Sequence, residues 1–70
     1  MRYLIVIEKT STGFSAYSPD LDGCVTTGST KEEVEQNMYD AIELHLEGMR
    51  QEGYSVPAPS AYSTYIEISA

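Results

Sequence analysis

Four carboxylates are the residues whose type and placement could support metal or acid–base chemistry: Glu8, Asp20, Asp22 and Glu67. Metal-assisted hydrolysis needs several acidic side chains that converge on one point from different elements. Asp20 and Asp22 share one predicted turn, where aspartate is favoured for backbone reasons alone. We therefore interpret all four as turn and surface charges, and predict no catalytic site, no metal and no cofactor. The alternative is a metal-dependent nuclease, in which Mg²⁺ would shift the amide signals of both aspartates.

The only cysteine and the only histidine form a second candidate, because a thiolate beside an imidazole can act as a nucleophile. Cys24 lies in a strand-like run, and His45 lies in the apolar stripe of a predicted helix. A buried free cysteine behaves as a small hydrophobic side chain, so we predict structural positions for both residues. One cysteine allows no internal disulfide and, with one histidine, no structural zinc site, which fits a reducing cytoplasm.

The elements that must position these residues begin with short strands. Runs rich in β-branched and aromatic residues predict strands over Arg2–Glu8, Gly13–Ser18 and Cys24–Thr27, with polar turns at Lys9–Gly13 and Pro19–Gly23. The first strand is apolar in both alternation phases, with Tyr3, Ile5 and Ile7 in one phase and Leu4 and Val6 in the other. Strands of this kind are normally covered on both faces.

One long helix follows. Thr30 and Glu33 have the spacing of a capping box, in which the Thr30 hydroxyl accepts from the Glu33 amide and the Glu33 carboxylate reaches back to the Thr30 amide. Gly53 predicts the helix end. Gly48 lies near the apolar stripe and predicts close approach of a neighbouring backbone. The stripe itself consists of Val34, Met38, Ala41, Ile42, His45 and Met49.

The predicted order is β-β-β-α-β, because a proline-containing connector at Tyr54–Ala61 leads into an alternating run at Tyr62–Ser69. This is an α+β fold, an antiparallel-rich sheet with one long helix on one face. A single helix leaves one apolar side of the first strand open, which favours a homo-oligomer or a protein partner. The helix spans about 34 Å and a six-residue strand about 20 Å, so the turns around Leu46, Met49 and Arg50 should extend past the sheet.

Composition and charge limit the classes of protein and of ligand that fit this sequence. The chain has 70 residues, 41% of them hydrophobic, and a net charge of −7. We expect a single domain over residues 1–70, with no membrane span and no leader peptide. The acidic balance argues against nucleic acid as the main ligand. Seven of the carboxylates fall in or beside the helix and suit a basic partner: Glu32, Glu33, Glu35, Asp40, Glu43, Glu47 and Glu52.

Three motifs together resemble the HicB-like antitoxin family. They are the run Tyr17–Gly28 (YSPDLDGCVTTG), the helical segment Ala41–Met49 (AIELHLEGM) and the connector Val56–Ser60 (VPAPS). The resemblance implies a partial RNase H-like fold without catalytic carboxylates, hence no enzyme. It also implies an oligomeric antitoxin that occludes a small, basic, mRNA-cleaving toxin of the HicA-like kind. The family often has proline where this chain has Asp22.

Many family members carry a C-terminal DNA-binding domain, and since this sequence ends after the predicted fourth strand we expect no direct DNA binding. An alternative remains: a stand-alone oligomeric HicB-like protein without a toxin, of structural or small-ligand-binding role. The candidate contact residues for a partner or second copy are Tyr3, Ile5, Tyr17 and Tyr65 on the sheet, and Glu43, Glu47 and Arg50 on the helix. Which sheet face the helix covers stays open.

Overall fold

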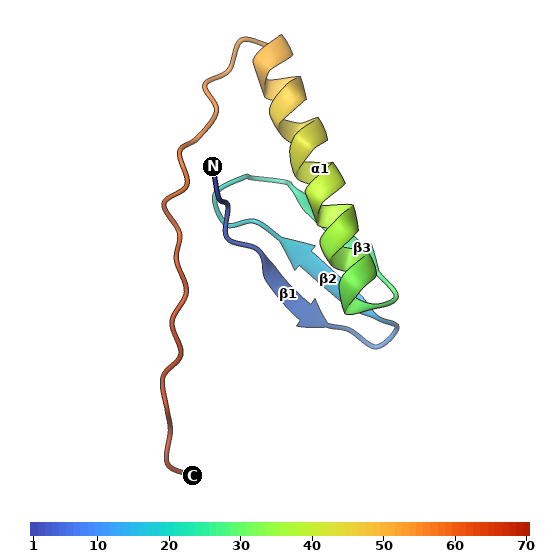
Figure 1. Ribbon diagram of the computed structural model, residues 1–70, viewed down its shortest axis with the longest axis vertical. Coiled ribbons are helices and arrows are strands. Elements are labelled where there is room, and N and C mark those ends of the chain that lie inside the picture. The colour runs from blue at the N-terminus through green and yellow to red at the C-terminus, as the bar shows by residue number, and fades with distance from the viewer.

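Two turns fold the first 28 residues into an antiparallel sheet, and one helix packs on it (Figure 1). The computed structural model describes residues 1–70. Its elements are β1 (Val6–Lys9), β2 (Phe14–Tyr17), β3 (Val25–Gly28) and α1 (Lys31–Gln51), and the strands lie in the order β1-β2-β3. The α+β class and the order of these four elements confirm the prediction.

The strand register decides which face the helix covers. Ile7 pairs with Ala16, which pairs with Thr26, so the three side chains share one face. Ala16 is fully buried in the core, which marks this face as the one beneath α1. Val6, Tyr17 and Val25 form the matching row on the opposite, outer face.

Both ends of α1 carry the predicted caps, with one change. The Thr30 hydroxyl accepts from the Glu33 amide at 3.0 Å, but the Glu33 carboxylate accepts from the amide of Ser29, at 2.8 Å, and not from that of Thr30. At the other end Gly53 has φ +77°. The amide of Tyr54 bonds to the carbonyl of Met49, which completes a Schellman motif. No helix of the chain combines the length and apolarity that crossing a bilayer requires.

The core lies between α1 and strands β2 and β3. Its buried hydrophobic residues are Ala16, Leu21, Cys24, Val34, Met38 and Leu46. Gly28 makes close packing possible, because a Cβ there would lie 2.6 Å from the backbone nitrogen of Val34. The last turns of α1 extend past the sheet as predicted (Figure 1). Leu46 is nevertheless buried, and Val56 of the connector packs against the same core.

The expectation for Gly48 is wrong. A Cβ built on this glycine meets no other atom within 4 Å, so no neighbouring backbone approaches it in this chain. Gly48 therefore lowers helix stability without a packing gain inside the monomer.

The predicted fourth strand does not form within this chain. Tyr62–Ser69 pairs with no strand, and the sheet has three strands only. The segment runs away from the sheet in extended form (Figure 1), which contributes to the 49 Å length of the molecule. A strand needs a neighbour for its backbone hydrogen bonds, and this segment has none within its own chain. We call residues 62–70 the tail.

Candidate partner-binding surfaces

An apolar groove lies along β1, because α1 packs mainly over β2 and β3. The groove has a volume of about 480 Å³. Ile7 belongs to β1, and Tyr3 and Ile5 lie in the segment that precedes this strand. We call this the β1 groove; its lining residues are Met1, Tyr3, Ile5, Ile7, Glu35, Met38, Tyr39, Ile42 and Glu43. The groove accepts apolar side chains and has carboxylates on its helix side.

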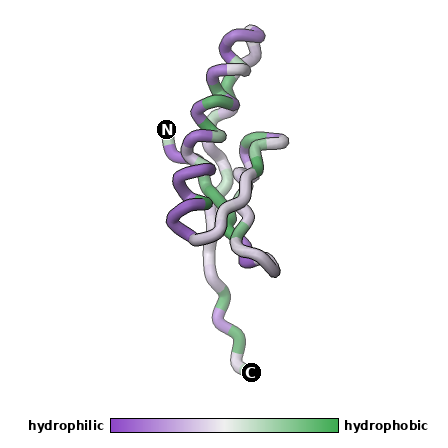
Figure 2. Tube along the Cα trace, turned by 90° about the vertical axis from the view of Figure 1, so that its right-hand side faces the viewer, coloured by the Kyte–Doolittle hydropathy of each residue, from purple (hydrophilic) through white to green (hydrophobic).

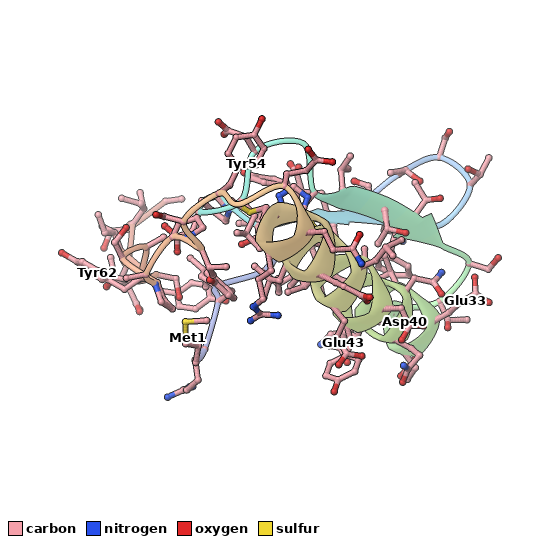
Figure 3. The ribbon with its side chains drawn as sticks, turned by 90° about the horizontal axis from the view of Figure 1, so that it is seen from above. Met1, Glu33, Asp40, Glu43, Tyr54 and Tyr62 are labelled. Carbon is pink, nitrogen blue, oxygen red and sulfur yellow. The ribbon has the colours of Figure 1, made fainter.

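A second surface, the acidic helix face, lies on the side of α1 away from the sheet. We define it by Glu32, Asp40, Glu43 and Glu47, all exposed. Figure 3 shows Asp40 and Glu43 pointing away from the strands. Gln36 donates to the Asp40 carboxylate at 3.2 Å, which fixes that side chain on the helix surface. The face is an unneutralised row of carboxylates that attracts positive charge.

The predicted contact residues fall into separate groups. Tyr3, Ile5 and Glu43 meet in the β1 groove. Glu43 also borders a shallow hollow with Glu47 and Arg50, so it joins the two surfaces. Tyr17 lies apart, on the outer face of the sheet. Tyr65 lies in the tail and is 99% exposed. The structure therefore gathers five of the seven residues around Glu43, and their role in binding stays a prediction.

Asp20 has a structural task that sequence reasoning missed. Its carboxylate accepts hydrogen bonds from the Ser60 hydroxyl at 2.9 Å, the Ser60 amide at 3.2 Å and the Ala61 amide at 3.2 Å. Nearby, the Tyr3 hydroxyl donates to the Pro57 carbonyl at 2.5 Å. We call these contacts the connector clasp. The partners of Asp20 lie forty residues away, and no local spacing indicates them.

The clasp also sets the protonation of Asp20. Partial desolvation alone would raise the pKa of this carboxyl, but the hydrogen bonds from Ala61 and Ser60 stabilise the charged form and outweigh it. The pKa of Asp20 is therefore lowered from its ordinary value of 3.8. At neutral pH Asp20 is therefore ionised and accepts these hydrogen bonds as a carboxylate.

The other chemical candidates do not assemble into a site. Cys24 is buried in the core, and burial raises the pKa of its thiol, so the thiolate is disfavoured. His45 is only partly buried, on α1. No group of three or more His, Cys, Asp or Glu side chains lies close enough together to hold a metal ion.

Residues 3–69 match the family described as HicB_like antitoxin of bacterial toxin-antitoxin system. The chain is 36% identical over 66 residues to an uncharacterized 14.9 kDa protein of Haemophilus phage HP1, covering 94% of this chain and 50% of the phage protein. It is 32% identical over 62 residues to a UPF0150 protein of Thermoplasma acidophilum, covering 87% of this chain and 90% of that protein.

Solved structures agree. A chain of a HicA3 and HicB3 toxin-antitoxin complex is 38% identical with a TM-score of 0.74, and the match covers 86% of this chain and 70% of that one. A crystal structure of antitoxin HicB3 is 40% identical with a TM-score of 0.70, over 81% of this chain and 42% of that one. The chain thus spans half the length of its phage relative and less than half of that HicB3 chain. Matched over nearly all of its own length, the chain belongs to the HicB-like antitoxins of bacterial toxin–antitoxin systems.

Proposed function

We propose that this protein acts as an antitoxin that binds a small, basic, mRNA-cleaving toxin of the HicA-like kind and covers its active site. It acts by binding and not by catalysis, and it works in the cytoplasm, where mRNA is the toxin's substrate. The observation that carries the proposal is the similarity to a chain of a HicA3 and HicB3 complex, at 38% identity over 86% of this chain. The match of residues 3–69 to an antitoxin family supports a non-enzymatic role.

The acidic helix face is the surface that we assign to the toxin. It carries exposed carboxylates along α1, and the whole chain has a net charge of −7. Complementary charge speeds encounter and selects partners more than it adds raw affinity. Tyr39, which is exposed where the β1 groove borders this face at Glu43, offers an aromatic contact of the type enriched at interfaces. Charge would guide the toxin here, and Tyr39 would add apolar contact.

Reversing the charge of this face should weaken toxin binding. The test is Glu43→Lys/Glu47→Lys, titrated by biolayer interferometry with a purified HicA-like toxin. We expect a loss of affinity of tenfold or more, with a slower association rate that depends less on salt. The matched control is Glu8→Lys/Asp22→Lys, which makes the same change in net charge at exposed positions off the helix.

Each outcome has a distinct meaning. Equal losses in both variants would show that only overall charge matters and would reject the acidic helix face as the site. Wild-type affinity in the helix variant would do the same. A wild-type chain that neither binds the toxin nor protects RNA from it would reject the antitoxin function.

A second candidate is a stand-alone oligomeric HicB-like protein without a toxin, in a structural or small-ligand-binding role. The β1 groove and the exposed apolar residues of the tail favour it, because both are surfaces suited to association. Failure of the toxin experiment together with a stable oligomer would favour this candidate.

A further inference from the structure

The tail contains four exposed large hydrophobic residues: Tyr62, Tyr65, Ile66 and Ile68. Tyr62, Ile66 and Ile68 are 87%, 79% and 76% exposed. They share one alternation phase, with Thr64 between them, and the opposite phase is Ser63, Tyr65, Glu67 and Ser69. Figure 2 shows this alternation where the tail stands clear of the body. An alternating apolar row on extended backbone is typical of a strand with one covered face. In this chain nothing covers it.

The connector clasp determines where the tail begins. Asp20 holds Ser60 and Ala61, and the Tyr3 hydroxyl holds the carbonyl of Pro57. Every residue from Tyr62 onward is exposed, whereas Ala61 is partly buried. The chain is therefore anchored up to Ala61 and then leaves its own body. From Ala61 onward the tail continues in a different direction from β1 (Figure 1). The tail therefore does not pair with β1 of its own chain.

The free edge of β1 is a matching acceptor. β1 pairs with β2 only, so its other edge has unpaired backbone groups. β1 has four residues, Val6–Lys9, and the half of the tail that carries Ile66 and Ile68, Tyr65–Ile68, is of the same length. On the other outer strand, β3, the Thr27 carbonyl already accepts a hydrogen bond from the Asn37 side chain at 2.9 Å.

The side chains of the tail also match the two faces beside β1. The apolar groove lies on the helix side of β1 and is lined by Tyr3, Ile5 and Ile7. A strand added at this edge with Ile66 and Ile68 toward the groove would fill it with apolar side chains. The opposite phase, with Glu67 and the serines, would then face away from the helix. With this face toward the groove, the apolar row and the polar row of the added strand are both in suitable surroundings.

We infer that residues 62–69 of one copy pair with β1 of a second copy as its fourth strand, and that the second copy returns its own tail in the same way. The result is a closed two-fold dimer with exchanged tails and two four-stranded sheets. The strand predicted from the sequence then exists, but between chains. The β1 groove is complete only when the second copy supplies Ile66 and Ile68, whereas Glu32, Asp40 and Glu47 of the acidic helix face lie outside the groove.

The test is the mass of the full chain in solution, measured by light scattering after size exclusion. We expect twice 7.7 kDa for the wild type. Ile66→Asp/Ile68→Asp should weaken dimerisation at least a hundredfold, because it places charge in the groove. Ser63→Asp/Ser69→Asp adds the same charge to the opposite phase and should remain a dimer. A wild-type monomer at 100 μM, or a dimer that persists in the isoleucine variant, overturns the inference.

A second measurement identifies the exchange itself and needs no variant. In an equal mixture of ¹³C-labelled and unlabelled chains, isotope-filtered NOEs should connect the methyl groups of Ile66 and Ile68 to Tyr3 and Ile5 of the other copy. The same NOEs found only within one chain would show that the tail folds back on its own β1, and would reject the exchange. Neither result depends on the toxin, so this inference and the antitoxin function fail separately.

Discussion

At the scale of single residues, Asp20 shows how a turn residue can organise a distant part of the chain. It lies between β2 and β3, yet its carboxylate accepts hydrogen bonds from the amides of Ser60 and Ala61 and from the hydroxyl of Ser60. Since the folded state lowers its pKa, the clasp stabilises the fold at pH values above the ordinary value of 3.8. This stability is lost as the pH falls through the lowered pKa and the carboxylate is protonated.

Acid titration should therefore release the connector. In two-dimensional NMR spectra, the amide signals of Ser60 and Ala61 should titrate together with a midpoint below pH 3.8. Asp20→Ala should abolish this titration and speed hydrogen exchange of both amides at neutral pH. Asp22→Ala is the control, because Asp22 is exposed and makes no such contact. Unchanged exchange in Asp20→Ala would show that the clasp does not hold the connector in solution.

At the scale of elements, two glycines differ in the space available for a side chain: one lies in the helix and the other at the junction between the helix and the sheet. Gly48 sits inside α1 with open space around it, whereas Gly28 ends β3 directly against the backbone of Val34. Neither has a positive φ, so the difference between them is one of packing alone.

Alanine substitutions should thus have opposite effects in urea unfolding. Gly48→Ala should raise the free energy of unfolding by about 0.5–1 kcal/mol, because alanine is the better helix former. Gly28→Ala should lower it by about 1–3 kcal/mol, because its Cβ would overlap Val34. A loss of stability in Gly48→Ala would instead show that another chain packs on this position.

At the scale of the whole molecule, the exchanged tails make folding and association one process. Each copy leaves the apolar β1 groove open until the other supplies its tail. A small domain buries a limited part of its surface and gains stability from a second copy. The acidic helix face lies on the other side of α1 from the sheet (Figure 3), so one dimer would present two such faces to toxin.

The thermal midpoint of the wild type should accordingly rise with protein concentration, by several degrees over a hundredfold range. Ile66→Asp/Ile68→Asp should show a lower midpoint that does not change with concentration. Circular dichroism at 222 nm measures both. A wild-type midpoint that stays constant over this range would contradict coupled folding and association.

The sequence by itself determined the type and order of the first four elements and both ends of the helix. These features depend on local causes: alternation in short strands, the hydroxyl of Thr30 at the helix start, and the left-handed conformation of Gly53 at its end. The alternation of Tyr62–Ser69 likewise predicted a strand, but a local pattern does not indicate which strand or which chain it pairs with.

Tertiary structure alone decided the rest. The first strand is apolar in both phases, so its pattern could not indicate that α1 covers the side of Ile7 and leaves Val6 outside. The bonds from Ser60 and Ala61 to Asp20 join residues forty positions apart, and no periodicity encodes such a contact. Beyond that anchor the tail pairs with no strand of its own sheet. The physical reason is long-range, because a strand forms only where its backbone finds a partner.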